Sequence, residues 1–248
     1  MTEPAFTDDR LLDGRVALRQ SADGYRAAID PVLLAAAIPA STRNALELGC
    51  GAGAASLCAL ARLPDLRVRG LERDASTADL ARFNAAANRM AGRFAVETGC
   101  VRAFAGTGFD LAFANPPYLQ ARRAQASTRA ARASANVEGE AGLADWIAAA
   151  LRAVAPRGHV LFIQRADRLD DLLAGLRSQA GEIVLFALWP KAGACAKRIL
   201  VRARKGVATP LRLAAGLVLH EADGSYTAAA DAILRGRSAL ALDEVQRV

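Results

Sequence analysis

Short apolar segments alternate with helical patterns through the middle of the chain. The apolar segments predict strands, and the amphipathic or alanine-rich segments between them predict helices. This alternation is typical of a parallel sheet that is covered by helices. The predicted strands are 44–48, 67–72, 93–98, 111–114 and 159–164, and the predicted helices are 52–62, 75–90 and 142–154.

The pattern changes on both sides of this alternating region. The first 30 residues predict a short β-hairpin, followed by a helix with Asp30 as its N-cap and Pro31 in its first turn. After a helix at 168–180, three more apolar segments predict antiparallel strands that close the edge of the sheet. These segments are 182–189, 198–204 and 215–220.

The composition is that of a folded globule, with 53% hydrophobic and 23% charged residues in 248. We expect one domain, with a hairpin and helix (1–40) over the ligand site and a Rossmann-like core (41–248). No apolar run is long enough to cross a bilayer and no signal peptide is visible, so we expect a cytoplasmic protein. The spacing of cysteine and histidine predicts neither a disulfide nor a metal site.

The formal charge of +7 favours a polyanionic partner, although the need for solubility could also explain it. From the charge alone, a nucleic-acid partner and a merely soluble surface are equally compatible with the sequence. The sequence gives no indication of the oligomeric state.

A glycine-rich turn follows the first predicted strand. Gly49, Cys50, Gly51 and Gly53 lie between this strand and a helix, where glycines let a ligand approach the backbone closely. Glu72 ends the second predicted strand, 19 residues after Gly53, at the distance where a carboxylate can accept hydrogen bonds from ribose hydroxyls.

The same turn satisfies the relaxed dinucleotide fingerprint, so a nicotinamide or flavin enzyme stays open at this point. Two features favour S-adenosylmethionine instead. Gly53 extends the pattern to Gly-x-Gly-x-Gly, and Glu47 places a carboxylate where it could bind the ammonium group of that cofactor.

Asn115, Pro116, Pro117 and Tyr118 follow the fourth predicted strand, at the end where open α/β sheets bind their ligands. The two prolines stiffen this tetrapeptide, which favours precise orientation of a substrate. Elsewhere in a protein the same four residues would be an ordinary turn. Their position after an apolar strand, about 60 residues beyond the glycine turn, favours catalysis.

The tetrapeptide suits methyl transfer to an exocyclic or amide nitrogen. The lone pair of such a nitrogen is delocalised, and two hydrogen-bond acceptors make it more nucleophilic. The Asn115 side-chain carbonyl and the Pro116 backbone carbonyl can supply them, while the Tyr118 ring can stack on a planar substrate.

These motifs together resemble the bacterial tRNA(Val) adenine-N6 methyltransferase family over nearly the whole chain. The resemblance includes Gln20 to Arg26 with Asp30 to Leu34, Lys197 to Val201, and Gly224 to Thr227. It implies a class I methyltransferase with a seven-stranded, mostly parallel sheet, helices on both faces and an antiparallel C-terminal edge. It also implies S-adenosylmethionine as donor, with Asp30 among the residues near the cofactor, and tRNA as acceptor.

The chain departs from this family after the third predicted strand. Many members carry an acidic residue there that binds the adenine amino group of the cofactor, whereas this chain has Cys100. We therefore expect that contact to come from the main chain at Cys100 or from elsewhere.

Basic residues beyond the tetrapeptide are candidate contacts for RNA phosphates. Their alternative role is that of a solvated surface segment. The candidates are Arg122, Arg123, Arg129, Arg132, Lys197 and Arg198.

Three other functions stay open from the sequence. The tetrapeptide reads an NH₂ group, so a release-factor glutamine or an amino group of ribosomal RNA or DNA would also fit. A non-catalytic RNA-binding scaffold with a methyltransferase fold is the alternative from another class.

Overall fold

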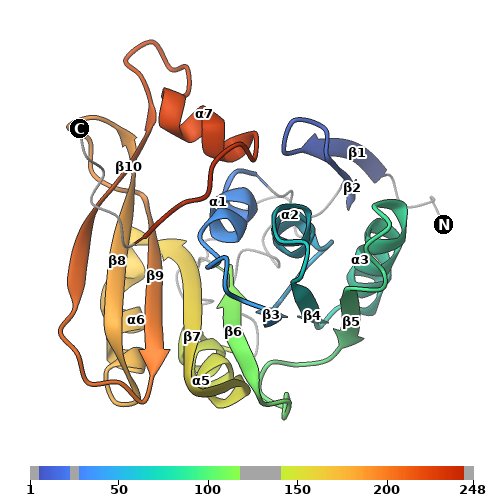
Figure 1. Cartoon of the computed structure of the whole chain (residues 1–248), viewed down its shortest axis with the longest axis horizontal. Helices are drawn as coiled ribbons and strands as arrows, with labels where there is room; N and C mark the ends of the chain where they lie inside the picture. Colours follow the sequence, from blue (N-terminus) through green and yellow to red (C-terminus); the bar gives the residue numbers. More distant parts are fainter. Residues whose placement is uncertain (1–5, 23–27, 118–140, 243–248) are drawn as a thin grey trace, which may run out of the picture.

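The computed structural model describes residues 6–22, 28–117 and 141–242. Its centre is one large twisted sheet, seen in Figure 1. The strands are β3 (Asn44–Leu48), β4 (Arg67–Glu72), β5 (Phe94–Thr98), β6 (Phe109–Ala114), β7 (Val154–Arg165), β8 (Ala180–Lys191), β9 (Arg198–Lys205) and β10 (Arg212–His220). In the described residues the sheet therefore has eight strands, in the order β10-β8-β9-β7-β6-β3-β4-β5.

Five neighbouring strands, from β7 to β5, pair in parallel. The expected antiparallel edge is confirmed for β9, which runs antiparallel to both β7 and β8. The expectation of seven strands is wrong, because in the described residues β10 adds an eighth strand, which pairs in parallel with β8. Since β9 inserts between β7 and β8, the free edge of β8 is left for β10, which reverses direction after β9 and so matches β8.

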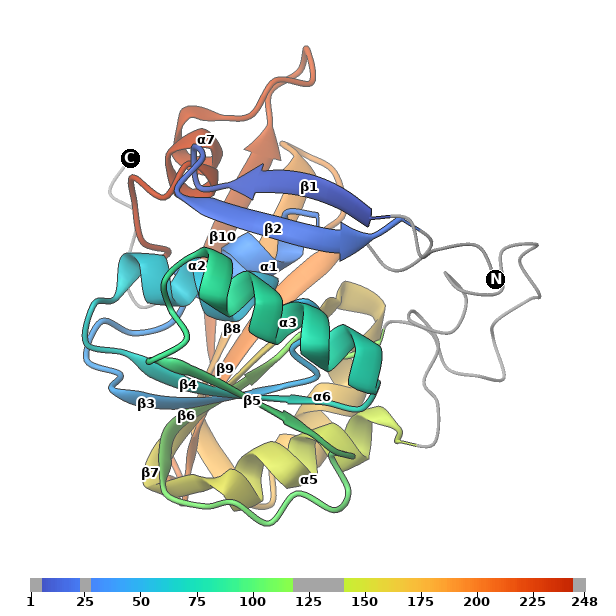
Figure 2. The same cartoon turned by 90° about the vertical axis from the view of Figure 1, so that its right-hand side faces the viewer.

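Helices cover both faces of the sheet, as the alternating pattern predicted. Figure 2 shows α1, α2 and α3 on one face and α5 and α6 on the other. Along β3, Ala45 joins the buried cluster beneath the first group, whereas Leu46 and Leu48 join the cluster beneath the second. The helices are α1 (Asp30–Ala36), α2 (Ala54–Arg62), α3 (Ala75–Ala87), α5 (Leu143–Ala153), α6 (Leu169–Leu176) and, beside α1 and β10, α7 (Ala228–Leu234).

The start of α1 differs from the expectation in one respect. The helix begins at Asp30, but the cap position is held by Ile29 in a helical conformation and has no side-chain cap bond. The Asp30 carboxylate instead forms an ion pair with Arg198 of β9, 3.0 Å away. This tertiary contact replaces the local capping bond that the sequence predicted.

The predicted N-terminal hairpin is confirmed as β1 (Phe6–Leu11) and β2 (Val16–Ser21). It forms a separate two-stranded sheet that lies over α3 (Figure 2). Asp13 in its turn forms ion pairs with Arg235 and Arg237, 3.1 and 3.0 Å away, just beyond α7. The hairpin is thus attached to the body in two places, at α3 and at the residues that follow α7.

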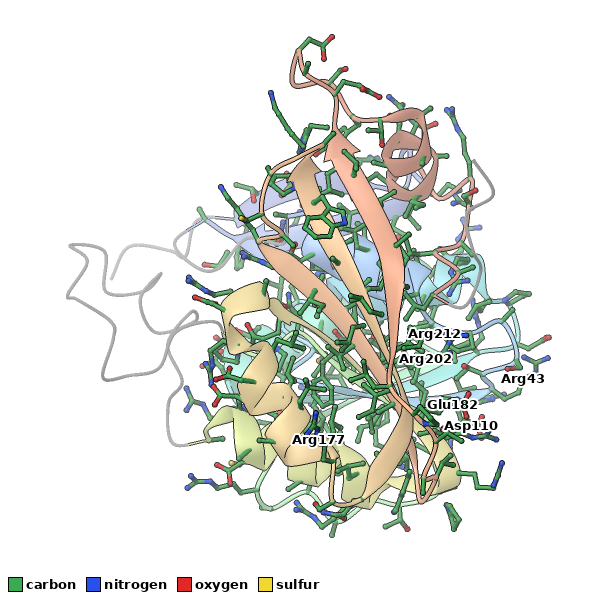
Figure 3. The ribbon with its side chains drawn as sticks, turned by 90° about the vertical axis from the view of Figure 1, so that its left-hand side faces the viewer. Arg43, Asp110, Arg177, Glu182, Arg202 and Arg212 are labelled. Carbon is green, nitrogen blue, oxygen red and sulfur yellow. The ribbon has the colours of Figure 1, made fainter. Side chains whose placement is uncertain are left out.

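The amino ends of β3 and β6 are joined through Asp110. Its Oδ2 accepts hydrogen bonds from the backbone N–H groups of Arg43 and Asn44, at 3.0 and 2.8 Å. Arg43 and Asp110 are labelled near each other in Figure 3. Within the described ranges, no helix has the length and apolar character needed to cross a membrane.

Candidate active site

The glycine turn joins β3 to α2, and its three glycines differ in what surrounds them. A Cβ on Gly49 would overlap the ring of Trp146 from α5, and a Cβ on Gly53 would lie 2.8 Å from Cε1 of Phe94. Gly51 has a φ of +54°, and a Cβ there would meet nothing within 4 Å. Two glycines therefore permit close packing, and Gly51 faces open space where a ligand can approach the backbone.

Glu72 lies beside this turn at the carboxyl end of β4. Its Oε2 accepts a hydrogen bond from the Gly51 N–H at 2.9 Å, and its Oε1 accepts one from the Asp74 N–H at 3.0 Å. Each carboxylate oxygen can accept more than one bond, so both oxygens can still take a ribose hydroxyl. The open face of Gly51 and the fixed Glu72 carboxylate fit the nucleoside part of S-adenosylmethionine.

Cys100 follows β5 next to Glu72. Thr98 pairs with Glu72 across the sheet, and the Gly99 N–H donates to the Glu72 carbonyl at 2.8 Å. The turn around Cys100 therefore lies beside the carboxylate that could bind ribose, which is where the adenine contact was expected. The Cys100 thiol is only partly buried.

Glu47 lies beneath the glycine turn, on the face of the sheet covered by α2. The residue is 3% exposed, and its carboxylate accepts hydrogen bonds from the N–H of Ser56, at 3.1 Å, and from the Ser56 hydroxyl. Burial raises the pKa of Glu47 to about 8, against the bonds from Ser56, which lower it. A nearby ammonium group would favour the ionised form, so the role predicted for Glu47 is compatible with its position.

The glycine turn and the tetrapeptide lie at the same edge of the sheet, after neighbouring parallel strands. Leu48, the last residue of β3, pairs with Ala114, the last residue of β6. Gly49 and Asn115 therefore each stand one residue beyond a matched pair. Pro116 is buried, and Asn115 and Pro117 are half-buried. A methyl donor on the glycine turn and an acceptor at Asn115 would be neighbours.

Gln164 is a polar residue of this site that the sequence analysis missed. It lies near the end of β7, next to β6, and its side chain is buried. Its Nε2 is 3.5 Å from both the Pro116 and the Pro117 carbonyl oxygens, and its Oε1 accepts a bond from the Arg165 N–H at 2.8 Å. A glutamine at the carboxyl end of an apolar strand next to the tetrapeptide strand was the signal available in the sequence.

Asp30 and Arg198 were assigned to different partners, the cofactor and the RNA, yet they contact each other. The side chains are 12% and 30% exposed, and the Arg198 Nε lies 3.0 Å from Asp30 Oδ2. Arg198 begins β9 opposite Arg165, at the same edge as the tetrapeptide. Lys197 is exposed beside it.

The remaining candidates lie outside the described residues. They are Tyr118, Arg122, Arg123, Arg129 and Arg132.

Comparison with known proteins identifies the type of domain. Residues 28–141, which hold the glycine turn and the tetrapeptide, match the family model of the methyltransferase small domain. Proteins named tRNA1(Val) (adenine(37)-N6)-methyltransferase match most of the chain. One from Aeromonas hydrophila is 32% identical over 201 residues, covering 80% of this chain and 84% of the relative. One from Aeromonas salmonicida is 30% identical over 202 residues, with the same coverage.

A solved structure shares the fold over most of the chain. A predicted O-methyltransferase, protein Atu636 from Agrobacterium tumefaciens, superposes with a TM-score of 0.73 and 26% identity, covering 87% of this chain and 100% of that one.

Proposed function

The chain belongs to the family of tRNA1(Val) (adenine(37)-N6)-methyltransferases, and on that premise we propose that it methylates the N6 nitrogen of an adenine in tRNA. It is a methyltransferase that depends on S-adenosylmethionine. The observation that carries the proposal is the matched pair Leu48 and Ala114, which brings the glycine turn and Asn115 to adjacent positions at one edge of the sheet.

The donor site is proposed around Glu72 and the glycine turn. Glu72 would accept bonds from the ribose hydroxyls, and Gly51 leaves room for the ligand against the backbone. Glu47 would face the ammonium group from below. The N-terminal hairpin and α1 would cover this site. The other residues proposed to line it are Gly49, Cys50, Gly53, Asp30 and Cys100.

The tetrapeptide would act on the acceptor. When bound, the donor supplies a methyl group on a positively charged sulfur, which makes this methyl electrophilic. The Asn115 Oδ1 and the Pro116 carbonyl would accept hydrogen bonds from the adenine NH₂ group and so direct its lone pair toward the methyl. In methyl transfer the new N–C bond would form as the S–C bond breaks, and the nitrogen would then release its extra proton to solvent. Tyr118 would stack on the base.

A basic surface at this edge would hold the tRNA. The formal charge is +7, and Lys197 is exposed next to Arg198 at the edge that carries the tetrapeptide. We propose that these two residues and the arginines at 122, 123, 129 and 132 contact phosphates. Because Arg198 already forms an ion pair with Asp30, we expect it to contribute less to phosphate binding than Lys197 does.

The test is transfer of radiolabelled methyl from S-adenosylmethionine to unmodified total tRNA, followed by nucleoside analysis. We expect N6-methyladenosine in the wild-type reaction. Asn115→Ala should lower turnover by about 10² or more and leave donor binding intact, since it removes an acceptor used in the transition state. Asn44→Ala, at an exposed asparagine at the other end of β3, is the matched control and should keep full activity.

Release factor and ribosomal RNA serve as parallel acceptors. Label only in the release factor would assign the chain to protein glutamine methylation and would overturn the proposed substrate. Binding of the donor without transfer to any acceptor would favour the non-catalytic scaffold.

A further inference from the structure

The N-terminal hairpin is attached to α3 through the outer edge of β2. A two-stranded hairpin is marginally stable alone, so it depends on such attachments. Val16 and Leu18 are buried beneath it, while Ala17 and Arg19 direct their backbone groups away from β1. The partners of these backbone groups are two asparagine side chains.

Asn84 and Asn88 of the α3 region bond β2 in the way a neighbouring strand would. Asn88 accepts from the Ala17 N–H at 2.9 Å and donates to the Ala17 carbonyl at 2.7 Å. Asn84 accepts from the Arg19 N–H at 2.9 Å and donates to the Arg19 carbonyl at 2.8 Å. Four residues of helix rise about 6 Å and two residues of strand about 6.6 Å, so the spacings match.

The two asparagines differ in their remaining contact. Asn84 is 1% exposed, and its Nδ2 also donates to the Ala52 carbonyl at 2.9 Å. Ala52 lies inside the glycine turn, between Gly51 and Gly53. Asn88 Nδ2 makes its further bond to the Asn84 carbonyl of its own helix, at 2.8 Å. Of the two side chains, Asn84 is the one that contacts the proposed donor site.

We propose that Asn84 is a positioning residue for the methyl donor, and that it couples donor binding to docking of the N-terminal hairpin. The turn is held from two sides, by Glu72 at the Gly51 N–H and by Asn84 at the Ala52 carbonyl. Losing Asn84 frees the carbonyl side and releases β2 at Arg19 at once. Because one side chain serves both, the binding of the donor and the docking of the hairpin must favour each other reciprocally. This inference rests on the proposed donor site.

The test compares Asn84→Ala with Asn88→Ala in the full chain. The ligand is S-adenosylhomocysteine, the demethylated product of the donor, and its Kd is measured by calorimetry. Both variants lose a pair of bonds to β2, and only Asn84→Ala loses the bond to Ala52. We expect Asn84→Ala to raise the Kd about tenfold and Asn88→Ala to change it less than about twofold. Equal effects would show that both asparagines act on donor binding only through the hairpin, and would overturn the positioning role of Asn84.

Hydrogen exchange gives a second readout that does not depend on turnover. In the wild type, the product should slow exchange of the Arg19 N–H, and in Asn84→Asp this protection should be lost. Asn84→Asp keeps the shape and the acceptor oxygen for the Arg19 N–H, but it loses the donor to both the Arg19 and the Ala52 carbonyls. It is the variant to use if Asn84→Ala fails to fold. Unchanged protection in Asn84→Asp would contradict the coupling.

The two proposals fail in different ways. A wild-type chain that does not bind S-adenosylhomocysteine would refute the proposed donor site. If Asn84→Ala binds S-adenosylhomocysteine as tightly as the wild type does, the role of Asn84 is refuted and the proposed donor site is not.

Discussion

Pro116 and Pro117 have no backbone N–H, so the backbone of these two residues can form hydrogen bonds only through their carbonyl groups. Gln164 offers an amide Nε2 at 3.5 Å from each of these carbonyls. The distances are long for hydrogen bonds, so Gln164 contributes more to orientation than to stability. Each carbonyl oxygen has two lone pairs, and Pro116 can accept from Gln164 and from the substrate together.

Gln164→Leu should lower turnover about tenfold without changing donor affinity, since leucine fills a similar volume but cannot hold the carbonyls. Steady-state kinetics and calorimetry on the same variant separate the two quantities. Gln164→Glu should lose activity more steeply than the wild type as pH rises, because an ionised carboxylate repels carbonyl oxygens. Gln179→Leu, at an exposed glutamine, is the control. Equal turnover in both leucine variants would refute the role.

Glu47 should make stability depend on pH. Its pKa rises from 4.5 to about 8 on folding, mainly through burial, so the folded chain keeps a proton that the unfolded chain releases. The contribution is fully present below pH 4.5 and is lost as pH rises toward 8. Glu47→Gln removes this loss, and its free energy of unfolding should gain on the wild type by about 1.4 kcal/mol for each pH unit in that window.

Urea unfolding at several pH values between these limits measures the difference. Glu221→Gln, at an exposed carboxylate, should follow the wild-type curve. Parallel curves for Glu47→Gln and the wild type would show that Glu47 is ionised in the folded state.

At the scale of elements, the junction between β3 and α2 carries the strictest geometric demand. Gly53 caps α2 with a φ of +91°, a left-handed conformation that costs other residues energy. A Cβ at this position would lie 2.8 Å from the Phe94 ring of β5, so the start of α2 packs closely against β5 at this glycine. A side chain at this position would disturb both the turn and the packing.

Gly53→Ala should destabilise the fold by roughly 1 to 3 kcal/mol, from backbone strain and the overlap with Phe94. It should also weaken the binding of S-adenosylhomocysteine, because the turn must shift. Thermal unfolding and calorimetry check the two effects. Gly92→Ala is the control, since a Cβ there meets nothing within 4 Å and Gly92 lacks the positive φ. A Gly53→Ala protein as stable as Gly92→Ala would contradict this account.

At the scale of the whole molecule, the carboxyl ends of the parallel strands carry the candidate site residues, and the amino ends carry structural contacts. The carboxyl ends of β3, β4, β6 and β7 carry the glycine turn, Glu72, the tetrapeptide and Gln164. At the amino ends of β3 and β6, Asp110 accepts hydrogen bonds from the Arg43 and Asn44 backbone N–H groups, a contact that holds the two strands together. A tRNA engaged at these carboxyl ends would meet Lys197, which is exposed next to Arg198.

Binding of tRNA should therefore depend strongly on salt. Each phosphate that is neutralised releases counterions, so we expect affinity to fall on the order of a hundredfold between about 50 and 200 mM salt for a few phosphate contacts. Fluorescence titration with labelled tRNA measures this slope. The Kd of S-adenosylhomocysteine, which lacks phosphate, should stay nearly constant over the same range. A flat tRNA curve would exclude phosphate contacts as the main source of affinity.

The sequence by itself determined the layout of the core, and it predicted where the candidate site residues lie. Apolar runs, glycines and prolines act over a few residues, so the strands, the glycine turn and Asn115 could be placed from local pattern. The confirmed strand limits of β3 and β4 and the hairpin reflect this. The family also followed from motifs that are contiguous in the chain.

Only the tertiary structure decided the contacts between residues far apart in sequence. The parallel direction of β10, the ion pair of Asp30 with Arg198, and the bonds of Asn84 and Gln164 all join segments that no local pattern relates. Asn84 reaches Arg19 across 65 positions, and a helix with a polar residue at that point shows the same pattern whether or not a strand lies beside it. Pairing of this kind depends on strand order and packing in space, which local periodicity does not encode.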